Sequence, residues 1–418
     1  MKFGNNRRST LDQVVTIINR NWQGGVLLAI AIIILAAELV MPAMSSRIDA
    51  LKVVLLLMLV TGIMILNIGL NKISTLFVRF LPMYIIEAVS ILFLFFGGES
   101  IGVDIFLFLK MIIWSIVGWY VVQSENKKLA VIILLAIIAF YVVTSVTTLI
   151  GSNIYPGICR ALTNSRDRTD DVVSFAAKMN IGGFSFVYSV VLLIPIGIYI
   201  IRNKLLNRII VIALLVPIIM MILSAGFTTA ILFTIVSIVL FLLPRGFSTK
   251  QFICGAIIGL IVSYPMLDWL GSVMMDISDN VERDNISQRL YDIGATMRGE
   301  TTSQNSDFDH RVELWALDFK LFMQNPLLGS SDSGGHSFIL DEMSKHGLFG
   351  IIFIIIEYVS IFKMFIKPYK NTLAFGYIVF TFVLQIGLSI LNPVISHVVF
   401  VLVVPLTVFI FEGKKLPY

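Results

Sequence analysis

The residues with the clearest potential for chemistry lie in one polar interruption of an apolar chain, positions 271–346. His336 stands there in the run Gly334-Gly335-His336-Ser337, and Arg311 precedes it. A neutral imidazole accepts protons near neutral pH, so His336 can serve as a general base. A guanidinium stays charged and binds phosphate oxygens through two parallel hydrogen bonds, which suits Arg311 to an anionic group. The interruption is therefore the first place to look for a site.

Other polar residues could support these two. Glu342 and Asp341 follow His336 on the same predicted helix and could orient its imidazole, although their spacing favours a plain polar helix face. A second polar segment, 151–178, carries Arg160, Arg166 and Arg168. The acids Asp167, Asp170 and Asp171 follow closely, so local ion pairing is the alternative to a role in binding. Arg283, which ten residues separate from Gly294, is a weaker candidate.

Several classes of site are missing from the sequence. It contains no Walker loop, no Gly-x-Ser-x-Gly elbow and no His or Cys spacing typical of a metal site. We therefore expect no metal and no cofactor, and we interpret Asp307-Phe308-Asp309 as part of a solvated loop. Two cysteines exclude a disulfide framework. Lys and Arg form no dense cluster, so nucleic acid is not an expected partner.

The elements that must position these residues are membrane helices. The chain has 418 residues, of which 57% are hydrophobic and 14% charged, and its mean hydropathy is +0.92. Soluble domains have nearer 25% charged residues, and a helical span needs about 20 apolar ones. We predict a single all-α transmembrane domain, 1–418, with about twelve spans at 24–43, 51–70, 80–97, 105–122, 129–150, 181–200, 209–225, 228–243, 251–270, 347–366, 373–391 and 397–411.

The distribution of charge predicts the orientation of these spans. With both termini in the cytoplasm, every cytoplasmic connection is short and basic, and most acidic residues fall on the outer side. Residues 271–346 then form a long external loop between the ninth and tenth spans. Within it, Trp315 and Phe319 belong to a helical repeat that ends at Asn325-Pro326, and a second helix leads from His336 into the tenth span. Residues 1–22 are predicted to form a cytoplasmic interfacial helix.

Two motifs in this loop suggest a family. His336-Ser337 is followed after nine residues by Gly347 and after two more by Gly350. Upstream, Arg311 and Trp315 precede the run Asn-Pro-Leu-Leu-Gly at 325–329. This ordered pair resembles the signature of the O-antigen ligase and O-antigen polymerase superfamily of bacterial polysaccharide assembly.

The resemblance implies a function and a place. Members transfer a glycan from undecaprenyl pyrophosphate to an acceptor sugar hydroxyl at the outer face of the bacterial cytoplasmic membrane, without a metal ion or cofactor. It implies that His336 is the general base and that Arg311, with Arg160, Arg166 and Arg168, binds the pyrophosphate. The partners implied are lipid-linked glycans and the bilayer, with a chain-length regulator and a flippase as further candidates.

One departure from the family pattern affects the choice of reaction. Related ligases usually carry an arginine in the break between the seventh and eighth spans, whereas this chain has Phe227 there, in LSAGFTTA. Gly226 permits either a helical break that faces a cavity or a plain tight hairpin. The departure favours a polysaccharide polymerase of the O-antigen or capsule type, with Arg160 as the second cation. A ligase and a lipid-linked oligosaccharide flippase remain alternatives.

Overall fold

The computed structural model describes residues 26–45, 114–163, 169–242, 271–281, 307–330, 332–394, 396 and 398–414, together with positions 60, 78, 81, 85, 269, 287, 290, 291, 294 and 295. These residues form helices and turns, and this part of the chain contains no strand. The chain divides into two compact units. Unit 1 comprises Met1–Phe241, Ile352–Ile386 and Val394–Tyr418, and unit 2 comprises Leu242–Ile351 and Gly387–Pro393.

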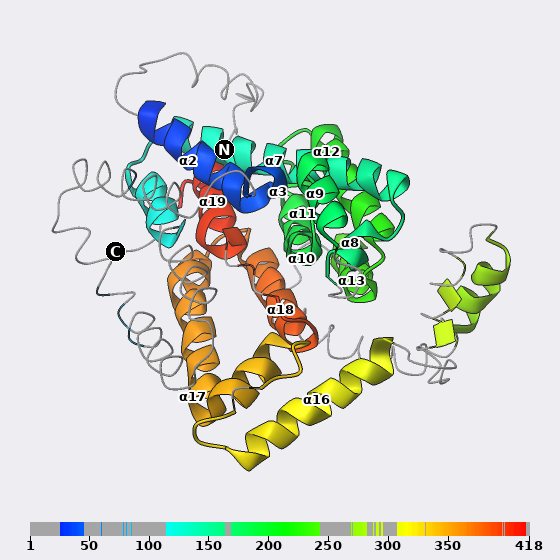
Figure 1. Ribbon diagram of the computed structural model, residues 1–418. Helices are drawn as coiled ribbons and strands as arrows, with labels where there is room; N and C mark the ends of the chain where they lie inside the picture. The colour runs from blue at the N-terminus through cyan, green and yellow to red at the C-terminus, as the bar shows by residue number, and fades with distance from the viewer. Residues whose placement is uncertain are drawn as a thin grey trace. The chain divides into compact units, whose positions relative to one another are not determined.

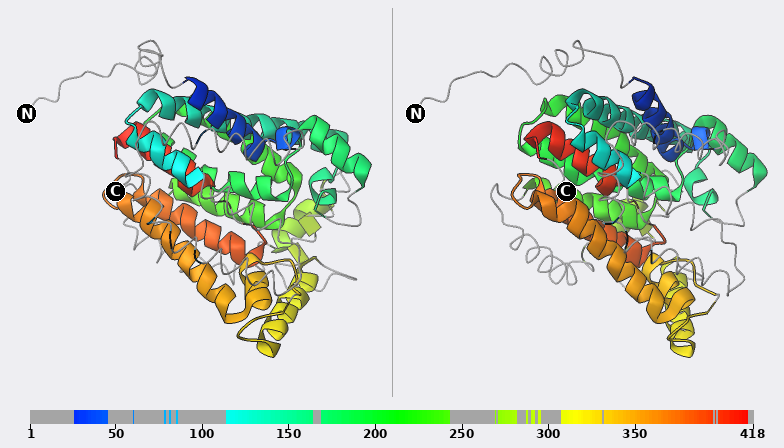
Figure 2. Two further views of the ribbon diagram at one scale, coloured as in Figure 1. Left: turned by 60° about the vertical axis from the view of Figure 1, so that its left-hand side comes forward. Right: turned by 90° about the vertical axis from the view of Figure 1, so that its left-hand side faces the viewer.

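Unit 1 is built around the long helix α7, Lys127–Ile154. Figures 1 and 2 show α2 (Val26–Val40) and α12 (Arg208–Ala225) packed along it. The other described helices of this unit are α3 (Pro42–Ser45), α8 (Ile158–Ala161), α9 (Asp170–Met179), α10 (Phe184–Val191), α11 (Leu193–Arg202), α13 (Thr228–Leu242), most of α18 (Phe375–Leu391) and α19 (Val404–Glu412), with π-helical turns at Phe362–Ile366 and Val399–Val403 and a 3₁₀ turn at Lys367–Tyr369.

Polar contacts fix the position of α7 where apolar packing alone would allow it to slide. Asn180 ends α9 in the left-handed conformation, with φ 55°. Its side-chain Nδ2 donates to Thr144 Oγ1 at 2.9 Å, and its Oδ1 accepts from the Ala43 amide at 3.1 Å. The Gly182 amide donates to Thr148 Oγ1 at 2.7 Å. One short turn thus joins α3, α7 and α9.

The helices agree in part with the predicted spans. Within the described part of the chain, four helices are long and apolar enough to cross a membrane: Lys127–Ile154, Phe184–Arg202, Arg208–Ala225 and Phe338–Tyr369. They match the fifth, sixth, seventh and tenth predicted spans. Shorter apolar helices at Thr229–Ile238, Phe375–Leu391 and Val399–Glu412 match the eighth, eleventh and twelfth.

The first predicted span contains α2 (Val26–Val40), and the other spans rest largely on the sequence. The second, third and ninth lie essentially outside the described residues, as does the interfacial segment 1–22, and the fourth is described only from Trp114. The count of twelve and the cytoplasmic placement of both termini stay predictions.

Unit 2 contains the two helices that carry the motifs. α16 spans Asp307–Gln324, and α17 spans Phe338–Ile361 with a kink at Gly347. The kink divides α17 into a polar first arm, 338–346, and an apolar second arm that continues into unit 1. In Figures 1 and 2 the first arm lies beside α16, and the connection 325–337 joins them.

Candidate functional site

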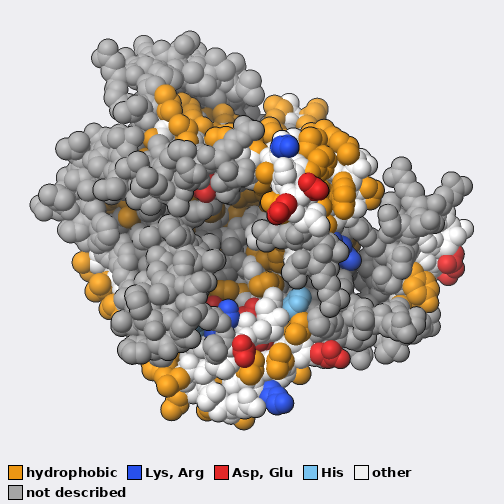
Figure 3. All heavy atoms as spheres, viewed as in Figure 1, with side chains coloured by type: hydrophobic (Ala, Val, Ile, Leu, Met, Phe, Trp, Pro, Cys, Tyr) orange, Lys and Arg blue, Asp and Glu red, His pale blue; other side chains and the backbone are white. Residues whose placement is uncertain are grey.

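The two sequence motifs meet in space. The Leu348 amide donates to the Pro326 carbonyl at 2.8 Å, and the Ser330 amide donates to the Ser344 carbonyl at 2.8 Å. The Asn-Pro-Leu-Leu-Gly run therefore packs directly on the kink of α17. Charged side chains are interspersed with apolar ones over this region, in the lower part of Figure 3.

Glycine is required on both sides of this contact. Gly329 has φ +77° and Gly347 has φ +60°, values that L side chains rarely adopt. A Cβ on Gly329 would overlap the carbonyl of Lys345, and one on Gly347 would lie 2.7 Å from the Gly329 nitrogen. A Cβ on Gly350 would overlap the Glu342 carbonyl. The glycines of both motifs thus allow two backbones to pass each other closely.

His336 lies at the end of the connection, immediately before the helix, as the sequence predicted. Ser337 caps α17, because its Oγ accepts from the Leu340 amide at 3.2 Å. The Phe338 amide donates to the Asn392 carbonyl at 3.2 Å. Ser337 is fully buried, whereas His336 is partly exposed. The backbone is therefore anchored on both sides of the point where the imidazole projects.

A buried pair of carboxyl groups supports this segment, and sequence reasoning missed it. Asp318 of α16 has no exposed surface, and its Oδ1 accepts from the Gly334 amide at 2.6 Å and from Ser344 Oγ at 3.1 Å. Asp341 is 7% exposed, and its Oδ1 accepts from the Gly335 amide at 2.8 Å. The interpretation of Asp341 as a plain polar helix face is wrong. The available signal was Asp318 itself, an acid between Trp315 and Phe322 on the apolar face of its helix.

The surroundings of Asp341 favour its protonated form. Asp341 stands in the polar first arm of α17, ahead of the apolar arm. Burial is the main cause that raises the pKa of Asp341 from 3.8 to about 7, and the charge of Asp318 raises it further. The Gly335 hydrogen bond and the positive charge of Lys345 act in the opposite direction. Near neutral pH this pair can hold a proton.

The other predicted orienting residue contacts a different histidine. Glu342 Oε2 lies 3.0 Å from His346 Nδ1, one helical turn further along α17. The two residues therefore form an ion pair at i, i+4 when His346 is protonated. Glu342 has this contact within its own helix, so its predicted link to His336 stays untested.

The backbone of Arg311 belongs to α16, and the structure does not describe its side chain. Asp318 follows it by two turns, so both residues lie on one face of α16, about 10 Å apart along the axis. The predicted role of Arg311 stays untested.

Arg160 lies at the break between α12 and α13. Its Nη2 donates to the Gly226 carbonyl at 3.2 Å, and Gly226 ends α12 in the left-handed conformation. Phe227 is 6% exposed, and its ring centroid lies 5.2 Å from that of Phe184 and 5.8 Å from that of Tyr188. Aromatic packing thus surrounds the Phe227 side chain at this break. Arg166, Arg168 and Arg283 lie outside the described residues.

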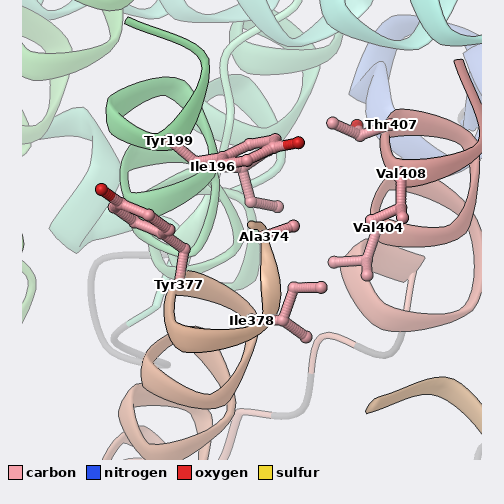
Figure 4. Close-up of a pocket in the computed structure, with 8 residues that line it drawn as sticks. All are labelled: Ile196, Tyr199, Ala374, Tyr377, Ile378, Val404, Thr407 and Val408. Atoms are coloured by element: carbon pink, nitrogen blue, oxygen red, sulfur yellow. The ribbon is translucent and has the colours of Figure 1, made fainter. Parts of the chain in front are cut away.

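A small apolar pocket of unit 1, shown in Figure 4, offers little chemistry. α11, α18 and α19 line it, and its only side-chain polar groups are the hydroxyls of Tyr199, Tyr377 and Thr407. Tyr199 already donates to Glu412 Oε1 at 2.6 Å. Within the described residues, no cluster of three or more His, Cys, Asp or Glu side chains could hold a metal ion. The polar connection of unit 2 remains the best candidate.

Comparison of the chain with protein-family models, curated proteins and solved structures found no match.

Proposed function

We propose that the protein is a polysaccharide polymerase that joins undecaprenyl-pyrophosphate-linked repeat units at the outer face of the bacterial cytoplasmic membrane. One observation carries the proposal. The two motifs behind the resemblance form a single packed unit, through the contacts of Pro326 with Leu348 and of Ser330 with Ser344. A motif pair that arose by chance in a variable loop has no reason to meet in this way.

The proposed reaction is a glycosyl transfer. His336 accepts the proton of an acceptor sugar hydroxyl, whose oxygen then attacks the anomeric carbon of the donor glycan. A new carbon–oxygen bond forms as the bond from the anomeric carbon to the phosphate oxygen breaks. Undecaprenyl pyrophosphate leaves with the bonding electrons, and arginine side chains stabilise its added charge. In this scheme Arg311 binds the pyrophosphate.

Arg160 is the further cation that we propose for the leaving group. Two features support it over Arg166, Arg168 and Arg283, whose placement the structure does not describe. Arg160 is partly exposed, and its guanidinium reaches the break between α12 and α13 through the Gly226 carbonyl. A guanidinium presents five N–H groups in a planar fork, a geometry that suits phosphate oxygens.

The central test replaces His336 and Arg311 with alanine in a strain that lacks the chromosomal gene. Loss of a general base costs about 100-fold to 10,000-fold in rate, so His336→Ala should abolish the long-chain glycan ladder. Arg311→Ala should also abolish it. His346→Gln on α17 and Lys320→Ala on the exposed side of α16 are matched controls that should keep the ladder. Stable protein with an unaltered ladder in both alanine variants would refute the proposal.

The rival functions differ in what a null strain accumulates. A lost polymerase leaves glycans of one repeat unit, whereas a lost ligase leaves long chains on the lipid carrier. A lost flippase leaves single lipid-linked units in the inner leaflet. Analysis of lipid-linked glycans from the null strain, with and without permeabilisation of the membrane, separates the three.

A further inference from the structure

We propose that Asp318 and Asp341 share one proton and together position His336, by holding the two glycine amides that precede it. Under this proposal neither aspartate touches the substrate. Both are positioning residues, which act through the 334–337 loop. The inference rests on the proposed function only in taking His336 as the reacting group. The hold on the loop can be tested without any assay of transfer.

The geometry makes the pair the principal attachment of this loop to the helices. Asp318 Oδ1 accepts from the Gly334 amide and Asp341 Oδ1 from the Gly335 amide, at 2.6 and 2.8 Å. Consecutive amides are thus bound by carboxyl groups from two different helices. A Cβ on Gly334 would lie 2.9 Å from Asp318 Oδ2, so the close approach needs glycine. Displacement of either carboxyl group releases the residues next to His336.

A shared proton follows from the hydrogen-bond inventory. Asp318 Oδ2 is buried and has no hydrogen-bond donor among the described residues. Two carboxylates cannot donate to each other, but a protonated carboxyl of Asp341 can donate to Asp318. That proton gives the orphan oxygen a partner and removes the repulsion between two buried negative charges.

The charged groups around the pair do not replace this proton. Lys345 of α17 acts on Asp341 and favours its charged form. Glu342 and His346 pair with each other on the same arm, and the connection contributes Asp332 and His336. The segment Gly387–Pro393, which binds the loop through Asn392, contains no charged residue. Among the described groups, Lys345 is the one cation whose charge favours the ionised form of Asp341.

This arrangement predicts a defined sensitivity to pH. The native state binds a proton that the unfolded chain has already released, because the pKa of Asp341 is raised from 3.8 to about 7. The stability that the pair gives the loop is therefore complete below about pH 4 and is lost as the pH rises through about 7. Above that value a second buried charge appears, and the amides of Gly334 and Gly335 should become exposed.

Asp341→Asn removes the titrating proton of residue 341 and keeps the shape of the side chain. Its amide Oδ1 can still accept from Gly335, and its NH₂ can donate to Asp318 at every pH. The measurement is hydrogen exchange of peptides covering 332–340, in full-length protein in lipid nanodiscs, corrected for intrinsic rates. Between about pH 6 and about pH 8 the wild type should lose roughly 10-fold of its protection, whereas Asp341→Asn should stay constant. Asp332→Asn, an exposed acid of the same connection, should follow the wild type.

Glycan transfer by the same samples gives the second measurement. The wild-type rate should fall above about pH 7, and Asp341→Asn should keep its rate to higher pH. If Asp341 has a purely structural role, Asp341→Asn should change the rate of glycan transfer but leave the pH dependence of that rate as in the wild type. If Asp341→Asn does not fold, Asp318→Asn provides the reciprocal test with the same expected result.

The outcomes distinguish this inference from the proposed function. Identical exchange in wild type and both asparagine variants at every pH would overturn the shared proton, whatever His336→Ala does. A pH-dependent difference in exchange, together with full transfer activity in His336→Ala, would sustain the carboxyl pair and refute His336 as the base.

Discussion

At two breaks in the helical backbone, side chains of opposite charge bind the backbone groups that lack helix partners. Before α17 the chain presents free amides at Gly334 and Gly335, and the carboxyl groups of Asp318 and Asp341 accept from them. After α12 the chain presents a free carbonyl at Gly226, and the guanidinium of Arg160 donates to it. The amides of Gly334 and Gly335 lack helix partners because they lie in the loop before Ser337, whereas the Gly226 carbonyl lacks one because the helix ends there. The helix dipole favours an acid near the first end of a helix and a base near the second. Each break is held by the type of side chain that matches its electrostatics.

The two breaks differ in burial, and this difference sets the expected energies. Asp318 has no exposed surface, whereas Arg160 is partly exposed. Loss of Asp318 removes a fully buried acceptor that serves two donors, whereas loss of Arg160 removes a single hydrogen bond to the buried Gly226 carbonyl. Substitutions at the first break should therefore cost more. The break before α17 also depends on a close passage of two backbones at Gly329 and Gly347.

The largest effect is expected where the two backbones pass. Gly329→Ala and Gly347→Ala each add a methyl group that overlaps or crowds the opposite backbone, at a positive φ. Strain and overpacking together should cost about 4 kcal/mol. Thermal unfolding in detergent should reveal the loss, with faster hydrogen exchange over residues 325–350. Gly376→Ala, where the added methyl meets no atom within 4 Å, is the matched control and should be neutral or slightly stabilising. Equal melting temperatures for all three variants would contradict the close passage.

Asp318→Ala should have the next largest effect. It leaves the Gly334 amide without its acceptor and removes one of the two acceptors of Ser344 Oγ, which also donates to the Asp341 carbonyl at 2.9 Å. The cost should be about 3 kcal/mol, confined to unit 2. Exchange over 332–346 should accelerate, while exchange in α7 should stay unchanged. Acceleration spread evenly over both units would show that the pair does not hold the loop specifically.

The sequence predicted the elements of both breaks from local patterns. Hydropathy indicated the helices now seen as α7, α12 and α17, since long apolar runs have few alternatives in a membrane. Ser337 was foreseeable as part of a helix start, and Gly226 as the end of a helix. These features depend on residues that lie within a few positions of one another.

The sequence did not predict what holds the breaks together. Asp318 and Asp341 approach each other only because the connection folds back, so no local pattern contains their interaction. The same applies to Arg160, whose carbonyl partner at Gly226 lies 66 positions away. Glu342, which the spacing offered as a partner for His336, contacts His346 at the ordinary helical separation. Tertiary contacts decided all of these assignments.

Arg160 allows the second break to be tested with a smaller expected effect. Arg160→Ala removes one partly exposed hydrogen bond to Gly226, at a cost of about 1 kcal/mol. Arg160→Lys should restore much of this stability but not glycan transfer, because an ammonium group lacks the planar fork that binds phosphate at two points. Thermal unfolding and the glycan ladder measure the two effects separately. A lysine variant with a normal ladder would show that any cation suffices at this break.

The smallest effect is expected for Glu342→Gln, which tests whether all acids near His336 act alike. Glu342 pairs with His346 across one turn of the first arm of α17, where both side chains are mostly buried, and it holds no loop amide in the described structure. Pairs of this kind contribute less than about 0.5 kcal/mol, so the melting temperature should hardly change. Exchange over 332–340 should keep the pH dependence of the wild type, in contrast to Asp341→Asn, although the two substitutions stand at adjacent positions. A loss of that pH dependence in Glu342→Gln would mean that charge along the whole arm, and not the buried pair, controls the loop.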